Sequence, residues 1–142
     1  MADTPKHSVS VAGIVIRGDR RILTIQRQDN ARWEPPGGVL ELDETIEAGL
    51  CREIREETGV DVTVERLTGV YKNLPRGIVA LVFRCRPRNG SVSSTDEARS
   101  VRWLTVEEIT EHMHPAYAVR VTDALSDSPA VRAHDGTNLI TT

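Results

Sequence analysis

The chain has few of the residues that mark secreted, membrane-spanning or nucleic-acid-coating proteins. Its two cysteines, Cys51 and Cys85, lie far apart and match no metal or redox spacing, so we expect reduced thiols in a cytoplasmic protein. It contains no apolar run long enough to span a membrane, and residues 1–10 lack the hydrophobic stretch of a signal peptide. Its formal net charge of −3 argues against general binding of nucleic acid.

Aromatic side chains are also scarce, at 4% of the residues, but the composition is otherwise that of a globular protein. The chain is 39% hydrophobic and 27% charged, and its 142 residues suffice for one domain with a substantial core. We therefore predict a single domain over residues 1–142. Its ends, residues 1–7 and about 127–142, are predicted to be flexible because terminal segments of polar residues are rarely held down.

Hydrophobic patterning predicts strands and helices in alternation. Apolar and β-branched runs between turn residues indicate strands at Val9–Ile16, Ile22–Arg27, Val62–Tyr71, Ile78–Cys85 and Val101–Trp103. The run Ile78–Cys85 is almost continuously apolar, as is typical of a central strand. Helices are expected from an N-cap at Asp43 to Gly59, from the capping box Thr105–Glu108 to His112, and over Ala116–Leu125.

The first predicted helix carries carboxylates on the side that should be buried. Ile46, Leu50 and Ile54 recur every four residues and form an apolar stripe. On a helical wheel Glu53 and Glu57 fall beside this stripe rather than on the opposite, solvated face. A buried carboxylate is costly unless it is paired, so these two acids need a partner.

The nearby side chains cannot neutralise this cluster by themselves. Glu56 adds a third acid at the edge of the stripe, and Arg52 is the one cation that points toward it. A divalent metal would balance the charge, and clustered oxygen ligands suit Mg²⁺ or Mn²⁺. Mg²⁺ in proteins commonly shares its coordination shell with substrate phosphates.

The acids belong to a longer pattern, which reads Gly38-x5-Glu44-x7-Arg52-Glu53-Ile54-x-Glu56-Glu57-x-Gly59-Val60. This pattern resembles the complete signature of the Nudix hydrolases, with every fixed position matched between residues 38 and 60. The preceding residues 33–38 are similar to the lead-in of that family, although Pro35 stands where a larger apolar residue is usual. The resemblance implies an α/β fold, an α/β/α sandwich on a mixed β-sheet.

The resemblance also implies cleavage of a nucleoside diphosphate linked to another group, with Mg²⁺ as the cofactor and Mn²⁺ as an alternative. The metal ligands it implies are Gly37, through its carbonyl oxygen, and Glu53, Glu56, Glu57 and Glu97. The general base is one of the glutamates of the pattern or Glu97, and Asp96 is an alternative to Glu97. Arg52 and Glu44 are expected to form a buried ion pair that supports the catalytic acids.

Five residues are candidates for binding the substrate. Arg27 falls on the inner face of its strand and could clamp a phosphate with its planar fork, or could simply end the strand in water. Gly37 and Gly38 allow a ligand to approach the backbone closely. Tyr71 could stack a base or belong to the core, and Asn73 lies beside a turn that could reach a ligand.

These features favour an enzyme whose partner is a small nucleotide, with neither nucleic acid nor a membrane expected and a homodimer left open. Among substrates we favour a nucleoside triphosphate, because the chain is short and lacks the N-terminal domain often seen in enzymes that cleave ADP-ribose. ADP-ribose and nucleotide sugars, and dinucleoside polyphosphates, are the alternatives. A module that senses nucleotides without cleaving them is disfavoured because the acids of the pattern are all present.

Overall fold

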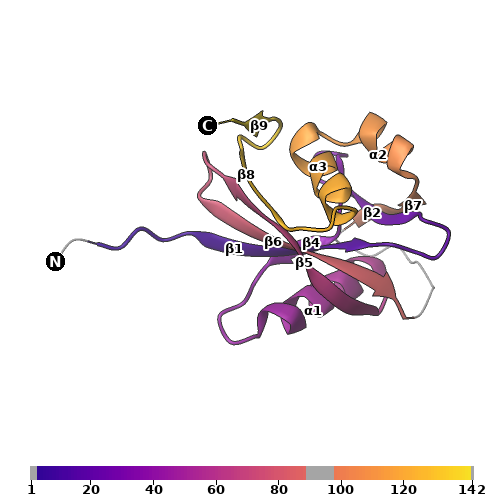
Figure 1. Ribbon diagram of the computed structural model, residues 1–142. Helices are drawn as coiled ribbons and strands as arrows, with labels where there is room; N and C mark the ends of the chain where they lie inside the picture. The colour runs from indigo at the N-terminus through magenta and orange to yellow at the C-terminus, as the bar shows by residue number, and fades with distance from the viewer. Residues whose placement is uncertain (1–2, 89–97, 142) are drawn as a thin grey trace.

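A computed structural model describes residues 3–88 and 98–141 and shows two β-sheets between helices on opposite sides (Figure 1). Helix α1 covers one side, and α2 and α3 cover the other, so the predicted α/β sandwich with a mixed sheet is confirmed. The helices are α1 (Ile46–Thr58), α2 (Val106–His112) and α3 (Pro115–Ala124). The strands are β1 (Ser8–Val15), β2 (Ile22–Arg27), β3 (Trp33–Glu34), β4 (Gly37–Val39), β5 (Val62–Asn73), β6 (Ile78–Pro87), β7 (Ala98–Leu104), β8 (Ala130–His134) and β9 (Leu139–Ile140).

The larger sheet has the strand order β4-β1-β6-β5-β8-β9, and the smaller sheet has the order β3-β2-β7. Strands β1 and β6 are parallel, as are β5 and β8, whereas the other pairs are antiparallel. The apolar run Ile78–Cys85 lies in β6, which is an inner strand as predicted. Cys51 is half-buried on α1 and Cys85 is buried in β6, and both are free thiols.

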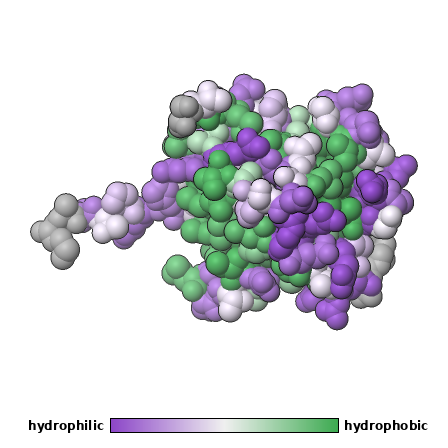
Figure 2. Space-filling model, viewed as in Figure 1, coloured by the Kyte–Doolittle hydropathy of each residue, from purple (hydrophilic) through white to green (hydrophobic). Residues whose placement is uncertain are grey.

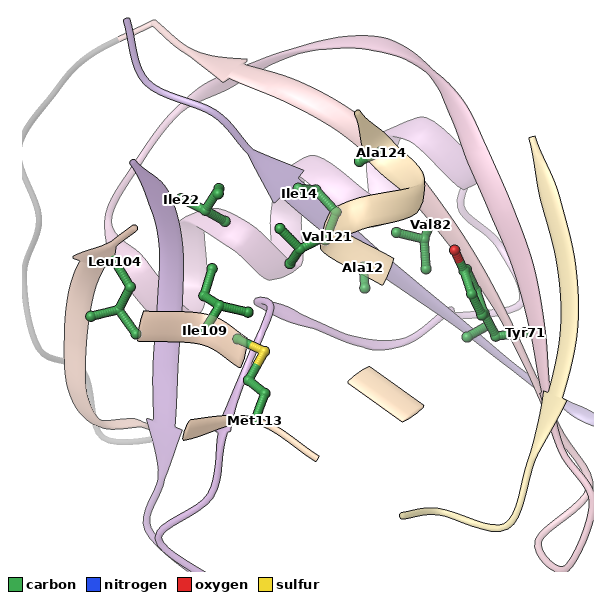
Figure 3. Close-up of a cluster of buried hydrophobic side chains, with 11 residues drawn as sticks. Ala12, Ile14, Ile22, Tyr71, Val82, Leu104, Ile109, Met113, Val121 and Ala124 are labelled. Atoms are coloured by element: carbon green, nitrogen blue, oxygen red, sulfur yellow. The ribbon is translucent and has the colours of Figure 1, made fainter. Parts of the chain in front are cut away.

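Two hydrophobic cores lie on the two faces of the sheets, because successive side chains of a strand point in opposite directions. Ala12 and Ile14 of β1 belong to the core beneath α2 and α3, whose members are drawn in Figure 3. Val11 and Val15 of the same strand belong to the core beneath α1. The surface is less regular, since the face seen in Figure 2 carries a band of apolar surface between hydrophilic patches.

The C-terminal segment corrects one expectation. Residues 127–142 were predicted to be flexible, but β8 pairs with β5 over five residue positions and β9 pairs with β8. Arg132 of β8 also forms a bidentate ion pair with Asp123 of α3, with both N–O distances 2.8 Å. The segment is therefore part of the larger sheet, and it carries His134 into the buried interior.

The N-terminus of α1 corrects a second expectation. The cap is Thr45, whose side chain accepts a hydrogen bond from the Ala48 amide at 3.2 Å, rather than Asp43. Ile46 is 42% exposed, so the buried stripe of α1 begins at Leu50. The helix ends as predicted at Gly59, which adopts a left-handed conformation with φ of 75°.

Candidate functional site

Glu53 and Glu57 of α1 reach the same cavity, which has a volume of about 650 Å³. They are four residues apart, so their side chains lie one helical turn apart on one face. Glu57 is 3% exposed and the side chain of Glu53 is 13% exposed. Glu56 is more open, with 48% of its side chain exposed, and it is not among the residues that line the cavity.

Strand β4 brings two glycines against these acids. The Gly37 amide donates a hydrogen bond of 2.7 Å to Oε1 of Glu57, which fixes the orientation of that carboxylate. A Cβ atom at Gly38 would collide with the carboxylate of Glu53, and one at Gly37 would collide with the backbone oxygen of Val11. A side chain at Gly37 is therefore excluded by the backbone of β1, whereas one at Gly38 would displace the carboxylate of Glu53, and both glycines line the cavity.

Arg52 connects the acids of α1 to the loop before the helix. Its Nε and Nη2 donate to the two carboxylate oxygens of Glu44, both at 2.8 Å, so the predicted pair is present. Its Nη1 donates to Glu53 at 3.0 Å and to Glu56 at 3.2 Å. Hydrogen bonds from Arg52 and from the Glu41 amide lower the pKa of Glu44 to about 2, so Glu44 is ionised at neutral pH.

Arg27 stands at the end of β2 and lines the same cavity. Its Nε lies 3.2 Å from Asp29 and its Nη1 lies 3.2 Å from Glu34, so two carboxylates hold the guanidinium in place. Burial raises the pKa of Glu34, and the attraction of Arg27 opposes this rise. Arg27 is thus oriented by its neighbours and lines the same cavity as Glu53 and Glu57 of α1.

The lining of the cavity also includes Tyr71 and Asn73 of β5. Tyr71 is fully buried, and its hydroxyl donates a 2.7 Å hydrogen bond to Asp123. Burial first, and then this hydrogen bond, raises the pKa of Tyr71 well above the usual value. Of the two roles that the sequence leaves open for Tyr71, the structure shows the place in the core, and the residue also lines the cavity (Figure 3). Asn73 lines the cavity, is 7% exposed, and accepts a hydrogen bond from the Arg76 amide at 3.3 Å.

Three further residues line the cavity and were not predicted from the sequence: Tyr117, Arg120 and His134. Arg120 is 6% exposed and His134 is 1% exposed. They come from α3 and β8, which are brought together by the parallel pairing of β8 with β5 and by the Arg132–Asp123 ion pair. The one signal in the sequence was an arginine on the apolar side of a short helix, and it has no characteristic spacing from His134.

The carboxylates of this site suit a hard divalent cation, because they offer oxygen ligands. Arg52 and the Gly37 amide now donate hydrogen bonds to these oxygens, and a cation could take the place of such donors. Within residues 3–88 and 98–141, no three His, Cys, Asp or Glu side chains form a ready metal cluster. Arg52 instead bridges Glu53 and Glu56, and the Gly37 amide contacts Glu57. Glu97 and its alternative Asp96 lie outside the described residues.

Comparison with known proteins identifies the family. The NUDIX domain matches residues 6–125 of the chain. The chain belongs to the Nudix family. A MutT-like protein of Streptomyces ambofaciens is 58% identical over 137 residues, which cover 96% of this chain and 89% of that protein. An ADP-ribose pyrophosphatase of Methanocaldococcus jannaschii is 34% identical over 109 residues, which cover 72% of this chain and 64% of that protein.

Solved structures show the same fold. The crystal structure of an ADP-ribose pyrophosphatase from Streptococcus suis has a TM-score of 0.76 and 20% identity, and covers 91% of this chain and 100% of its own. This Nudix protein is a hydrolase that acts on pyrophosphate bonds, and members of its family generally need a divalent metal. None of its described helices has the length and apolar character needed to cross a membrane.

Proposed function

We propose that this Nudix hydrolase cleaves nucleoside triphosphates with Mg²⁺, and that Mn²⁺ can replace Mg²⁺. The observation that supports this most is one cavity lined by two kinds of side chain. Glu53, Glu57 and Arg27 are charged residues of its lining, and Tyr117 and Ala80 are apolar or aromatic residues of the same lining. The charged residues suit phosphates, and the apolar ones suit a planar base.

The metal ligands in this proposal are the Gly37 carbonyl oxygen, Glu53, Glu57 and, from the edge of the same helix, Glu56. Glu97 joins them on the strength of the family resemblance. A divalent cation bound there would neutralise the phosphate oxygens and acidify a water molecule. The hydrogen bond from the Gly37 amide keeps one oxygen of Glu57 directed at β4.

Arginines in and beside the cavity position the substrate and the acids. Arg27 orients the phosphates, since its planar fork can donate two parallel hydrogen bonds to phosphate oxygens. One of the glutamates, Glu53, Glu56, Glu57 or Glu97, accepts the proton of the attacking water. The Arg52–Glu44 pair does not touch the substrate. It holds Glu53 and Glu56 in place through Nη1 of Arg52, the guanidinium nitrogen that is not bonded to Glu44.

ADP-ribose is the second candidate substrate, because the archaeal relative at 34% identity is an ADP-ribose pyrophosphatase. Nucleotide sugars and dinucleoside polyphosphates complete the set to be compared. A sensor that binds a nucleotide without cleaving it is the candidate outside the enzymes. A hydrolysis panel with Mg²⁺ and with Mn²⁺ separates all of these.

The first prediction concerns Glu57. Replacing Glu57 with Gln removes a negative charge from the metal site, and we expect turnover of every substrate in the panel to fall by about 100-fold or more. Mn²⁺ binding, followed by electron paramagnetic resonance, should weaken in parallel. Glu47→Gln is the matched control, because Glu47 is exposed on the outer face of the same helix.

Turnover by Glu57→Gln equal to that of the wild type at saturating Mg²⁺ would contradict the metal assignment. Hydrolysis of ADP-ribose in preference to all nucleoside triphosphates would replace the proposed substrate by the second candidate. Tight metal-dependent binding of one compound without any turnover would identify a sensor.

A further inference from the structure

Arg120 is a buried cation, and one of its hydrogen-bond donors, Nε, has no partner among the described residues. The residue is 6% exposed. The centre of its guanidinium lies 4.9 Å from the ring of Tyr71 and 4.6 Å from the ring of Tyr117. Because the rings pack against it, its hydrogen bonds must be made in the guanidinium plane, along the edge formed by Nε and Nη2.

The one polar contact of that edge is with His134, and it brings two donors together. The Gly136 amide donates to Nδ1 of His134 at 3.0 Å, so Nδ1 carries no proton. Burial, followed by the charge of Arg120, lowers the pKa of His134, so the ring is neutral at pH 7 and its proton is on Nε2. Nε2 lies 3.4 Å from Nη2 of Arg120, which is also a donor.

Three N–H groups therefore meet at one place without an acceptor: Nε and Nη2 of Arg120 and Nε2 of His134. Buried donors are almost always paired in folded proteins, and leaving one unpaired is costly. All three groups belong to residues that line the cavity. The missing acceptor is thus most simply supplied by a ligand in that cavity.

The charges around the cavity indicate an acceptor without a full negative charge. Two arginines, Arg27 and Arg120, line it together with four carboxylates, so the formal charge of the lining is already −2 (Asp29, Glu34, Glu53 and Glu57). Glu34 attracts Arg120 as well as Arg27, although no carboxylate of the described residues lies within ion-pair distance of Arg120. Arg120 therefore has a balancing charge nearby and lacks hydrogen-bond acceptors.

The surroundings of the three donors favour a flat ring as the carrier of that acceptor. Ala12, Ile78 and Ala80 line the same cavity, and such apolar walls suit the faces of a heterocycle better than a hydrated phosphate. We propose that Arg120 and His134 form a subsite that selects nucleobases with a carbonyl oxygen at the contacted position, so that 6-oxopurines are preferred to 6-aminopurines. This inference rests on the proposed function, in which the substrate is a nucleotide.

Inosine and adenosine nucleotides test the subsite, because their bases differ at position 6. Hypoxanthine presents an oxygen there, whereas adenine presents an amino group that would face three donors. We expect the wild type to hydrolyse ITP with kcat/KM at least about tenfold higher than that for ATP, since unpaired polar groups in a buried site discriminate strongly. Calorimetry of the monophosphates should show IMP binding more tightly than AMP, in the presence or absence of metal.

Arg120→Gln tests which residue makes this choice. A glutamine amide can accept from the amino group of adenine and donate to its N7, so the ratio of kcat/KM for ITP to that for ATP should fall toward one. Arg86→Gln is the matched control, because Arg86 is exposed and is not among the residues that line this cavity. The ratio should be that of the wild type in this control. A ratio compares two substrates in one protein, so partial unfolding does not change it.

The outcomes separate this inference from the proposed function. Equal kcat/KM values for ITP and ATP in the wild type would overturn the subsite even if both triphosphates are hydrolysed. A wild-type preference for ITP that persists unchanged in Arg120→Gln would also overturn it. If no triphosphate is hydrolysed but IMP binds more tightly than AMP, the proposed function fails and the subsite stands.

Discussion

Glu44 supports the site without lining the cavity, and its ionisation should govern how the site responds to acid. Both of its carboxylate oxygens accept hydrogen bonds from Arg52, and Arg52 in turn reaches Glu53 and Glu56. The pKa of Glu44 falls from 4.5 to about 2 mainly because of the hydrogen bonds from Arg52. The folded state therefore holds this carboxylate ionised at a pH where the unfolded chain would take up a proton.

The sign of the pH effect follows from this depressed pKa. The contribution of the Arg52–Glu44 pair to the free energy of unfolding is complete above pH 4.5 and declines as the pH falls toward 2. We expect the wild type to exceed Glu44→Gln in stability at pH 6, and the gap to shrink steadily below pH of about 4.5. Urea unfolding at several pH values measures the gap. A gap that is the same at pH 6 and pH 3 would contradict the role of the pair.

Single residues differ in how far the sequence could predict them. Glu53, Glu57, Gly37 and Gly38 belong to a continuous pattern, and the structure brings them together in one wall of the cavity. Arg120 could not be predicted in this way. Its surroundings depend on contacts between segments that are distant in the chain, and these arise only when the sheet is assembled.

Helix α1 carries the acids of the cavity, Glu53 and Glu57, and the spacing of its apolar residues was sufficient to predict the helix. Its N-cap was predicted two residues too early because Asp43 and Thr45 are both good capping residues. The choice between them is made by the preceding loop, in which Glu44 binds both Arg52 and the Glu41 amide. Thr45 is thereby placed in an extended conformation with its side chain above the first turn.

Thr45→Ala tests the observed cap. The substitution leaves the Ala48 amide without its side-chain acceptor, and we expect the free energy of unfolding to fall by about 1 kcal/mol. Asp43→Ala should change it by less than about 0.5 kcal/mol, since Asp43 is exposed and does not cap the helix. Chemical denaturation of both variants gives the comparison. A larger loss in Asp43→Ala than in Thr45→Ala would restore the prediction from the sequence.

For the molecule as a whole, the sequence predicted the class of fold and most of the strands, but not that the C-terminal segment forms β8 and β9 of the larger sheet. The resemblance at residues 38–60 carried the fold, and alternation along the strands divided their side chains between two cores. Strand β8 was missed because its side chains are largely polar or exposed, with Val131 85% exposed. Its pairing with β5 is made by backbone hydrogen bonds, which leave little trace in side-chain patterns.

Deleting residues 127–142 measures what this end contributes to the whole molecule. The deletion removes β8 and β9, leaves Asp123 without Arg132, and exposes the edge of β5 beside the buried ring of Tyr71. Asp123 would then be a largely buried carboxylate with one remaining side-chain donor, the hydroxyl of Tyr71. We expect the free energy of unfolding to fall by more than about 2 kcal/mol, because partly desolvated charges and buried polar groups are costly without partners.

Deleting residues 2–6 is the control, since the described residues there are exposed and precede β1. Thermal unfolding of both shortened chains gives the comparison. Equal midpoint temperatures would show that the C-terminal segment is dispensable. A lower midpoint for the C-terminal deletion alone would show that β8 stabilises the sheet and the cavity beside it.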